Sequence, residues 1–282
     1  MNGPELLEAH ADRLKTRMGG CFLGERVVFR GRDLHNDLTE IDWIELYLVG
    51  ITGRRFTRKQ VLMLQAMWGY TSYPDARIWN NRVAALAGSA RSTGALGMAA
   101  ALAVSEAAIY GGGIYIPSIE FLMRARRELD GGAVLGDCVQ KELKTRRGIA
   151  GYGRPLVSRD ERIAPLMARA RVLGFDDGPH VRLAHEVDAY LHAGRWRLRM
   201  NAGGLLAALA ADLGLSPRDY YLFMFPVFLA GMPPCYAEAT ERPEGALFPL
   251  SCAHIRYEGP PKRSWPQPFP ASAADGAESP FP

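Results

Sequence analysis

Apolar residues recur along most of this 282-residue chain at the three- and four-residue spacing of amphipathic helices. Asp42 is the expected N-cap of one helix, and Thr57 with Gln60 forms a capping box that begins the next. A strand-like pattern is confined to residues 21–30, and a weak apolar stripe predicts a helix over residues 4–17. The pattern therefore predicts a mainly α-helical protein.

The second half of the chain continues in the same way. Helices are predicted over residues 117–129, 134–145, 163–173, 181–193 and 196–213, and a last one begins at Ser216 and Pro217. The Ala/Gly-rich segment 80–110 predicts a central, well-buried helix or helix pair, because small residues let helices pack closely. Its only charged residues, Arg82, Arg91 and Glu106, should then be paired or face a polar site.

Composition narrows the possible partners. The formal charge is +4 and no long Lys/Arg block occurs, so nucleic-acid binding is not indicated. Four well-separated cysteines without CxxC spacing indicate reduced thiols, and the first 15 residues lack a secretory signal. The most apolar run, residues 92–105, is too short for a membrane span. We expect a cytoplasmic protein without a membrane partner, ending in a disordered tail over residues 266–282.

The richest candidate for chemistry is the arginine-rich segment 146–162. Gly151 and Gly153 flank Tyr152, and Ser158 with Glu161 resembles a capping box that would place Arg162 in the first turn of a helix. Main-chain amides and arginines at a helix start are suited to a carboxylate or phosphate. The alternative is a surface turn between two amphipathic helices.

Other common sites are not indicated. The chain has no Walker loop and no dinucleotide fingerprint. His185 and His192 share a helix face but lack further ligands at convergent spacing, so no metal site is predicted. Ser89 lacks the second glycine of a nucleophile elbow.

Several segments, in the right order, resemble the citrate synthase superfamily, including its shorter citryl-CoA lyase-type members. The similar segments are residues 29–38 (FRGRDLHNDL), 42–50 (DWIELYLVG), 80–94 (NNRVAALAGSARSTG), 151–162, 200–201 and 257–260 (YEGP). The resemblance implies a citrate synthase-like fold and a homodimer. A large helical domain (residues 1–111 and 205–265) would hold an inserted small helical domain (residues 112–204). Coenzyme A would bind as a thioester cosubstrate, with no tightly bound cofactor, near the main chain of Gly151, Tyr152 and Gly153.

The departures concern the catalytic positions. The family has a His just after the long central helix, where this chain has Tyr110 and three glycines, and a second His where this chain has Arg154. The position of the family's general base, an Asp, falls on Gly203. Arg162 does match the arginine that grips a substrate carboxylate, so the cleft is suited to an anion but not to the family's proton transfer.

Three hypotheses follow. The first is an acyltransferase or lyase that acts on a CoA thioester and a 2-oxo acid or citrate-like carboxylate through altered catalytic residues. The second is an inactive homologue that binds acyl-CoA or a carboxylate as a regulator or partner subunit, and the third is a purely structural dimer. The candidate residues are Arg154, Tyr110 and Glu106 for catalysis and Arg162, Asn201 and Arg91 for substrate binding. Tyr115 is a further possible replacement for a lost catalytic group.

Overall fold

The computed structural model describes residues 2–12, 15–109, 111–154, 159–195, 197–246 and 251–261, without the side chain of Cys252. The chain packs as two compact units, Met1–Leu247 and Phe248–Pro282. In the second unit the described residues contain a 3-10 turn at Cys252–His254. The tail predicted over residues 266–282 lies outside the described residues.

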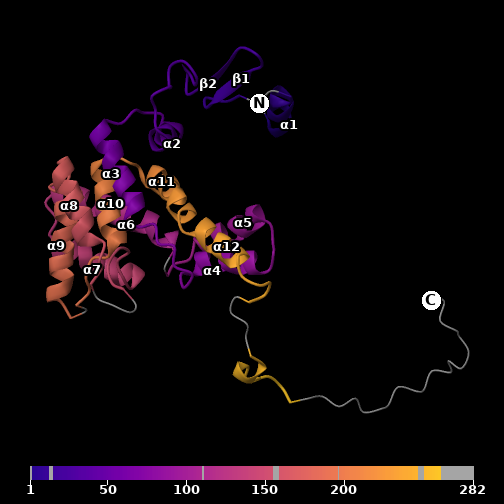
Figure 1. The fold of residues 1–282 in the computed structure, drawn as a ribbon. Coiled ribbons are helices and arrows are strands. Elements are labelled where there is room, and N and C mark those ends of the chain that lie inside the picture. Colours follow the sequence, from indigo (N-terminus) through magenta and orange to yellow (C-terminus); the bar gives the residue numbers. More distant parts are fainter. Residues whose placement is uncertain are drawn as a thin grey trace, which may run out of the picture. The chain divides into compact units, whose positions relative to one another are not determined.

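The first unit is built almost entirely of helices (Figure 1). They are α1 (Gly3–His10), α2 (Trp43–Thr52), α3 (Arg58–Gly69), α4 (Trp79–Ser89), α5 (Gly94–Val104), α6 (Tyr115–Asp130), α7 (Leu135–Arg146), α8 (Ile163–Leu173), α9 (Pro179–Ala193), α10 (Ala202–Asp212), α11 (Pro217–Leu229) and α12 (Met232–Thr240). A 3-10 turn, Gly112–Ile114, precedes α6. Helices α6, α9 and α10 pack on one another, whereas α4, α5 and α12 form a second group. The mainly α-helical prediction is confirmed.

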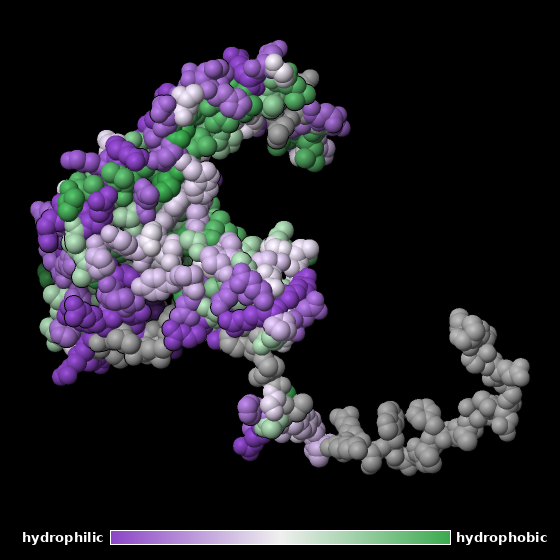
Figure 2. Space-filling model, viewed as in Figure 1, coloured by the Kyte–Doolittle hydropathy of each residue, from purple (hydrophilic) through white to green (hydrophobic). Residues whose placement is uncertain are grey.

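A small antiparallel sheet lies near the N-terminus. Strands β1 (Gly19–Phe22), β2 (Arg26–Phe29) and β3 (Arg32–Asp33) pair in the order of the sequence. Hydrophobic residues remain at the surface over these strands (Figure 2), where Leu23 in the turn is 90% exposed. The helix predicted over residues 4–17 was too long, because α1 ends at His10 and buries no residue against the chain.

The most deeply buried helix is not the one that the sequence pattern indicated. Segment 80–110 does form a helix pair, α4 and α5, whose close packing uses Gly97 against the side chain of Ala87. However, α5 is not well buried, since Leu96 is 67% exposed. The central helix is α10, in which every residue from Ala202 to Ala211 is buried. Both helices are rich in small residues, so composition alone does not distinguish them.

Helix α10 begins later than predicted. Before it, Met200 forms a bridge with Tyr152, and the helix is capped by the side chain of Asn201. The capping interactions predicted at Asp42, and at Thr57 with Gln60, are confirmed.

The helical stretch Pro217–Thr240, which spans α11 and α12, is 24 residues long and apolar enough, by length and composition alone, to cross a membrane. Tyr220, Phe223 and Met224 on α11 are fully buried within the chain. Phe223 stacks on Trp68 of α3 with ring centroids 5.0 Å apart. The core helix of a soluble protein has these same properties, so this stretch is weak evidence for a membrane span.

The predicted division at residues 112 and 204 does not coincide with the two compact units and stays a prediction.

Candidate functional site

The glycine-rich turn is held against the start of α10. Gly151 has φ +91°, and a Cβ on it would lie 2.6 Å from the Cα of Gly204. Its carbonyl accepts a hydrogen bond from the N–H of Asn201 at 2.9 Å. Only glycine combines this positive φ with such a close approach. Backbone packing therefore explains Gly151 without any ligand.

Tyr152 and Gly153 are also tied to the protein. The Tyr152 side chain is buried, and its hydroxyl donates to the carbonyl of Ala184 on α9 at 2.9 Å. The N–H of Tyr152 donates to the Ile149 carbonyl, and the N–H of Gly153 donates to the Arg199 carbonyl. Two of the three main-chain amides predicted to meet coenzyme A are therefore already hydrogen-bonded. The role of this turn in coenzyme A binding stays a prediction.

Asn201 links the turn to the helix. Its Oδ1 accepts from the N–H of Gly203 as the α10 cap, and its Nδ2 donates to the carbonyl of Gly153 at 2.7 Å. Both polar ends of the amide are therefore occupied by main-chain groups. Asn201 borders the cavity described below, but its observed contacts position the turn.

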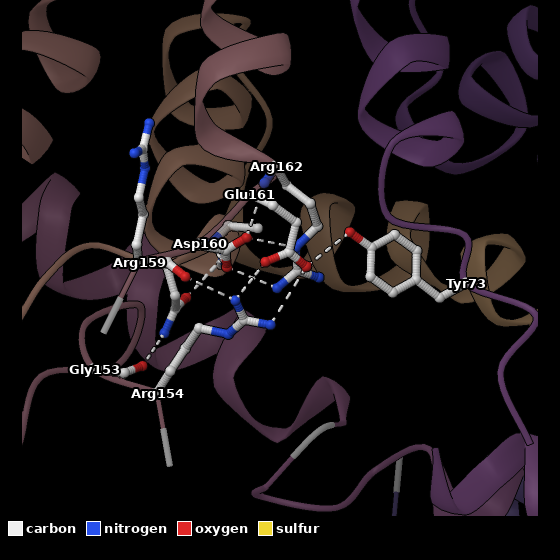
Figure 3. A network of polar contacts seen from close by, with 10 residues as sticks. Tyr73, Gly153, Arg154, Arg159, Asp160, Glu161 and Arg162 are labelled. Carbon is white, nitrogen blue, oxygen red and sulfur yellow. Dashed lines mark hydrogen bonds and ion pairs between the residues drawn. The ribbon is translucent and has the colours of Figure 1, made fainter. Parts of the chain in front are cut away.

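Arg162 is fixed by a buried carboxylate. Its Nε and Nη2 donate to the two oxygens of Asp160 at 2.8 and 2.7 Å (Figure 3). The Asp160 side chain is fully buried, and its Oδ2 also accepts from the N–H of Ala202 at 2.8 Å. Burial by itself would raise the pKa of Asp160, but the hydrogen bonds and charge of Arg162, with the Ala202 amide, outweigh it and lower that pKa to about 2. Asp160 is thus an anion that anchors Arg162 to the first residue of α10.

A second ion pair lies beside the first. Arg154 Nη1 donates to Glu161 Oε2 at 2.6 Å and to the carbonyl of Arg159 at 3.0 Å. The Tyr73 hydroxyl, from the loop before α4, donates to the other oxygen of Glu161 at 3.0 Å (Figure 3). The guanidinium of Arg162 lies 5.4 Å from the centre of the Tyr73 ring. Tyr73 therefore joins this loop to both arginines.

These groups border a cavity of about 710 Å³. Its lining includes the following sequence-predicted residues: Gly151, Tyr152, Gly153, Arg154, Arg162 and Asn201. A cavity of this size is typical for a small organic ligand. The described residues 151–154 and 161–162 of the predicted segment thus lie at a cavity, together with Asn201.

Arg91 and Glu106 do not lie at the cavity. Arg91 caps the end of α4, where its guanidinium donates to the carbonyls of Gly88 and Arg242. Glu106 accepts a hydrogen bond from the Tyr221 hydroxyl at 2.5 Å and does not line the cavity. Tyr110 lies outside the described residues.

At Gly203, to which the resemblance assigns the position of a general base, an added side chain would meet Ile114. A Cβ on Gly203 would overlap Cδ1 of Ile114, and it would lie 3.1 Å from Oδ1 of Asn201. Both Gly203 and Ile114 line the cavity. The isoleucine side chain therefore occupies the volume that a side chain at residue 203 would enter.

Two cavity groups, Tyr73 and Glu161, were not among the predicted site residues, whereas Tyr115 was predicted as a replacement for a lost catalytic group. Tyr73 gives no local sequence signal beyond its place in a proline-containing loop. Tyr115 lines the cavity at the start of α6, and burial raises the pKa of its hydroxyl. A phenol with a raised pKa is a hydrogen-bond donor at neutral pH and not a base. Tyr115 is therefore suited to a carbonyl or carboxylate oxygen.

Comparison with solved structures shows which known proteins share this fold. Citryl-CoA lyase from Hydrogenobacter thermophilus superposes with a TM-score of 0.79 at 22% identity, over 90% of this chain and 97% of that one. ATP citrate lyase from Methanothrix soehngenii, in complex with citrate and coenzyme A, gives 0.72 at 17% identity, over 92% of this chain and 44% of that one. This chain has the citrate synthase fold. Citrate synthase from Thermoplasma acidophilum, in a ternary complex with carboxymethyl coenzyme A and oxaloacetate, gives 0.61 at 18% identity, over 81% and 60% of the two chains.

The fold predicted from the resemblance is thereby confirmed. No protein-family model matches the sequence, and no curated protein matches it. At these low identities the citrate synthase fold is shared, while the chemistry has to be argued from the residues of the cavity.

Proposed function

We propose that the cavity beside Arg162 binds a carboxylate-bearing ligand of the citrate or 2-oxo-acid kind together with a CoA thioester, and that it does so without abstracting a proton from the thioester. Structures with the same fold, those of ATP citrate lyase and citrate synthase, were solved with citrate or oxaloacetate and with coenzyme A or its analogue. This supports the ligand class. The contacts of Arg162 in this chain support carboxylate binding, and those of Gly203 support the absence of proton abstraction.

Arg162 is the observation on which the binding part rests. A guanidinium has five N–H donors, and Asp160 takes two of those on Arg162. The side chain is 24% exposed and borders the cavity, so three donors remain to grip a carboxylate. Because Asp160 and the Tyr73 ring fix the guanidinium, little side-chain entropy is lost when a ligand binds.

The described cavity lining lacks a suitable general base. A base needs a pKa near the working pH. Asp75 and Glu161 are its carboxylates, and both are paired with arginines. The hydrogen bond from Arg77 lowers the pKa of Asp75, and that from Arg154 lowers the pKa of Glu161. No histidine is present among the described lining residues, and Gly203 has no side chain. The geometry thus favours binding over the altered-enzyme hypothesis.

Two measurements test this proposal. Thermal shift with citrate, oxaloacetate, acetyl-CoA and coenzyme A should show stabilisation by at least one carboxylate and one CoA compound, because a ligand of the folded state raises the melting temperature. Deuterium exchange at the acyl α-carbon of acetyl-CoA should stay at the uncatalysed rate. Exchange above that rate would show that a base is present and would restore the enzyme hypothesis. Absence of any thermal shift at millimolar ligand would leave only a structural role.

We also propose that the exposed side of α5 is covered by a second copy of the chain, as the resemblance implies. The helix carries no charged residue from Gly94 to Val104, yet Leu96 is largely exposed. A helix that is apolar all round is normally buried. Analytical ultracentrifugation of the wild-type chain should give a dimer, and Leu96→Glu should shift it to a monomer. A monomeric wild-type chain would contradict this proposal.

A further inference from the structure

The cavity has an apolar wall that a carboxylate does not use. Gly203 and Leu206 lie one turn apart on α10, and Ile114 packs over Gly203. Val227 and Phe228, near the end of α11, also line the cavity. The wall therefore consists of hydrocarbon side chains from three elements of the core.

The polar side of the cavity, at Arg162, lies at the start of α10, and the apolar wall lies further along the same helix. Asp160 anchors Arg162 to the N–H of Ala202, the first residue of the helix. Leu206 is four residues further on, about 6 Å along the axis at 1.5 Å per residue. When Arg162 holds a carboxylate ligand, a CoA thioester bound beside that ligand therefore has hydrocarbon side chains within reach of a short acyl chain.

We infer that the CoA thioester carries an acyl group larger than acetyl, that its hydrocarbon chain lies against Leu206 beside Gly203, and that Ile114 limits its size. This inference rests on the proposed binding of a CoA thioester. Gly203 leaves the wall without the polar side chain that the resemblance would place there, and Ile114 presents a hydrocarbon surface instead. Such a wall stabilises a methylene group and offers nothing to a second charge.

The test is a calorimetric titration of the full chain with acetyl-CoA, butyryl-CoA and hexanoyl-CoA. The dissociation constant should fall about fourfold for each methylene that becomes buried, or roughly fifteenfold from acetyl to butyryl. In Ile114→Phe the larger ring fills the space, so the gain with chain length should be lost while acetyl-CoA still binds.

Gly203→Ala gives a second and independent route. The added methyl group would meet the flexible end of Ile114 and push it into the cavity, so this variant should also lose the gain with chain length. Ile51→Ala is the matched control, because Ile51 packs against the core but does not line the cavity. It should keep the chain-length dependence of the wild-type chain.

The possible outcomes separate the two proposals. If acetyl-CoA binds and its affinity does not increase with chain length, the apolar subsite is refuted while the proposed function stands. If no ester binds, the proposed function fails and the subsite fails with it. If Ile114→Phe and Gly203→Ala keep the full gain, the hydrocarbon group lies elsewhere and Ile114 does not limit its size.

Discussion

Replacement of Asp160 by asparagine tests the anchor of the site. The change removes the charge that holds Arg162 but keeps an oxygen for the N–H of Ala202. The pKa of Asp160 is lowered from 3.8 to about 2. Since one pKa unit corresponds to 1.36 kcal/mol, Asp160→Asn should reduce the free energy of unfolding by about 2 kcal/mol at pH 7. The melting temperature should fall by roughly 4–8 °C.

The pH dependence has a definite sign. Because the pKa of Asp160 is lower in the folded chain than in the unfolded chain, its contribution is complete above the unfolded value near 4. It is lost as the pH falls through the folded value of about 2. Urea unfolding at pH 7, 5, 4 and 3 should therefore show a constant difference between wild type and Asp160→Asn down to about pH 5, and a shrinking one below it.

A neighbouring residue supplies the control. Glu161 pairs with Arg154, but its side chain is 56% exposed. An exposed pair contributes about 0–1 kcal/mol, so Glu161→Gln should have a small effect on the free energy of unfolding. Equal effects of the two substitutions at pH 7, or a difference for Asp160→Asn that does not shrink on acidification, would refute the account of Asp160.

Two further substitutions test the surroundings of the site. Tyr73→Phe removes the hydrogen bond to Glu161 but keeps the ring, so the free energy of unfolding should fall by at most about 1.5 kcal/mol in urea titrations, and a larger loss would contradict the observed contacts. Gly151→Ala should lower the free energy of unfolding by more than about 2 kcal/mol, because the φ of Gly151 is positive and an added Cβ would meet Gly204. The control Gly148→Ala has free space for the methyl group and should be tolerated. Similar melting temperatures of these two variants would show that the turn is not packed as described.

Much of the secondary structure could be predicted because helix caps are local. The hydrogen bonds of Asp42 and Thr57 join residues three apart in the sequence, so a short motif contains both partners. The relative burial of α5 and α10 could not be predicted in this way. It depends on which helices surround each one, and both consist of small apolar residues.

The candidate site was predictable only in part. The resemblance indicated Arg162, and the structure places it at a cavity. The contacts that fix Arg162 were not predicted. Its direct partner Asp160 is two residues before it, but the Tyr73 ring over Arg162 and the Ala202 amide that binds Asp160 lie 89 and 40 residues from Arg162 in the sequence. For Arg91 the resemblance was misleading. Arg91 belongs to the similar segment 80–94, but it donates hydrogen bonds to main-chain carbonyls at the end of α4 and does not line the cavity.

The central claim is that Arg162 binds a ligand carboxylate, and calorimetric titration of citrate tests it most directly. Arg162→Lys keeps the positive charge beside Asp160 but loses the planar, bidentate donor set, so citrate should bind at least about tenfold more weakly than to the wild-type chain. Arg171→Lys, on the exposed side of α8, is the matched control and should bind citrate as the wild type does. Equal citrate affinity in all three proteins, or no citrate binding to the wild type, would contradict the claim.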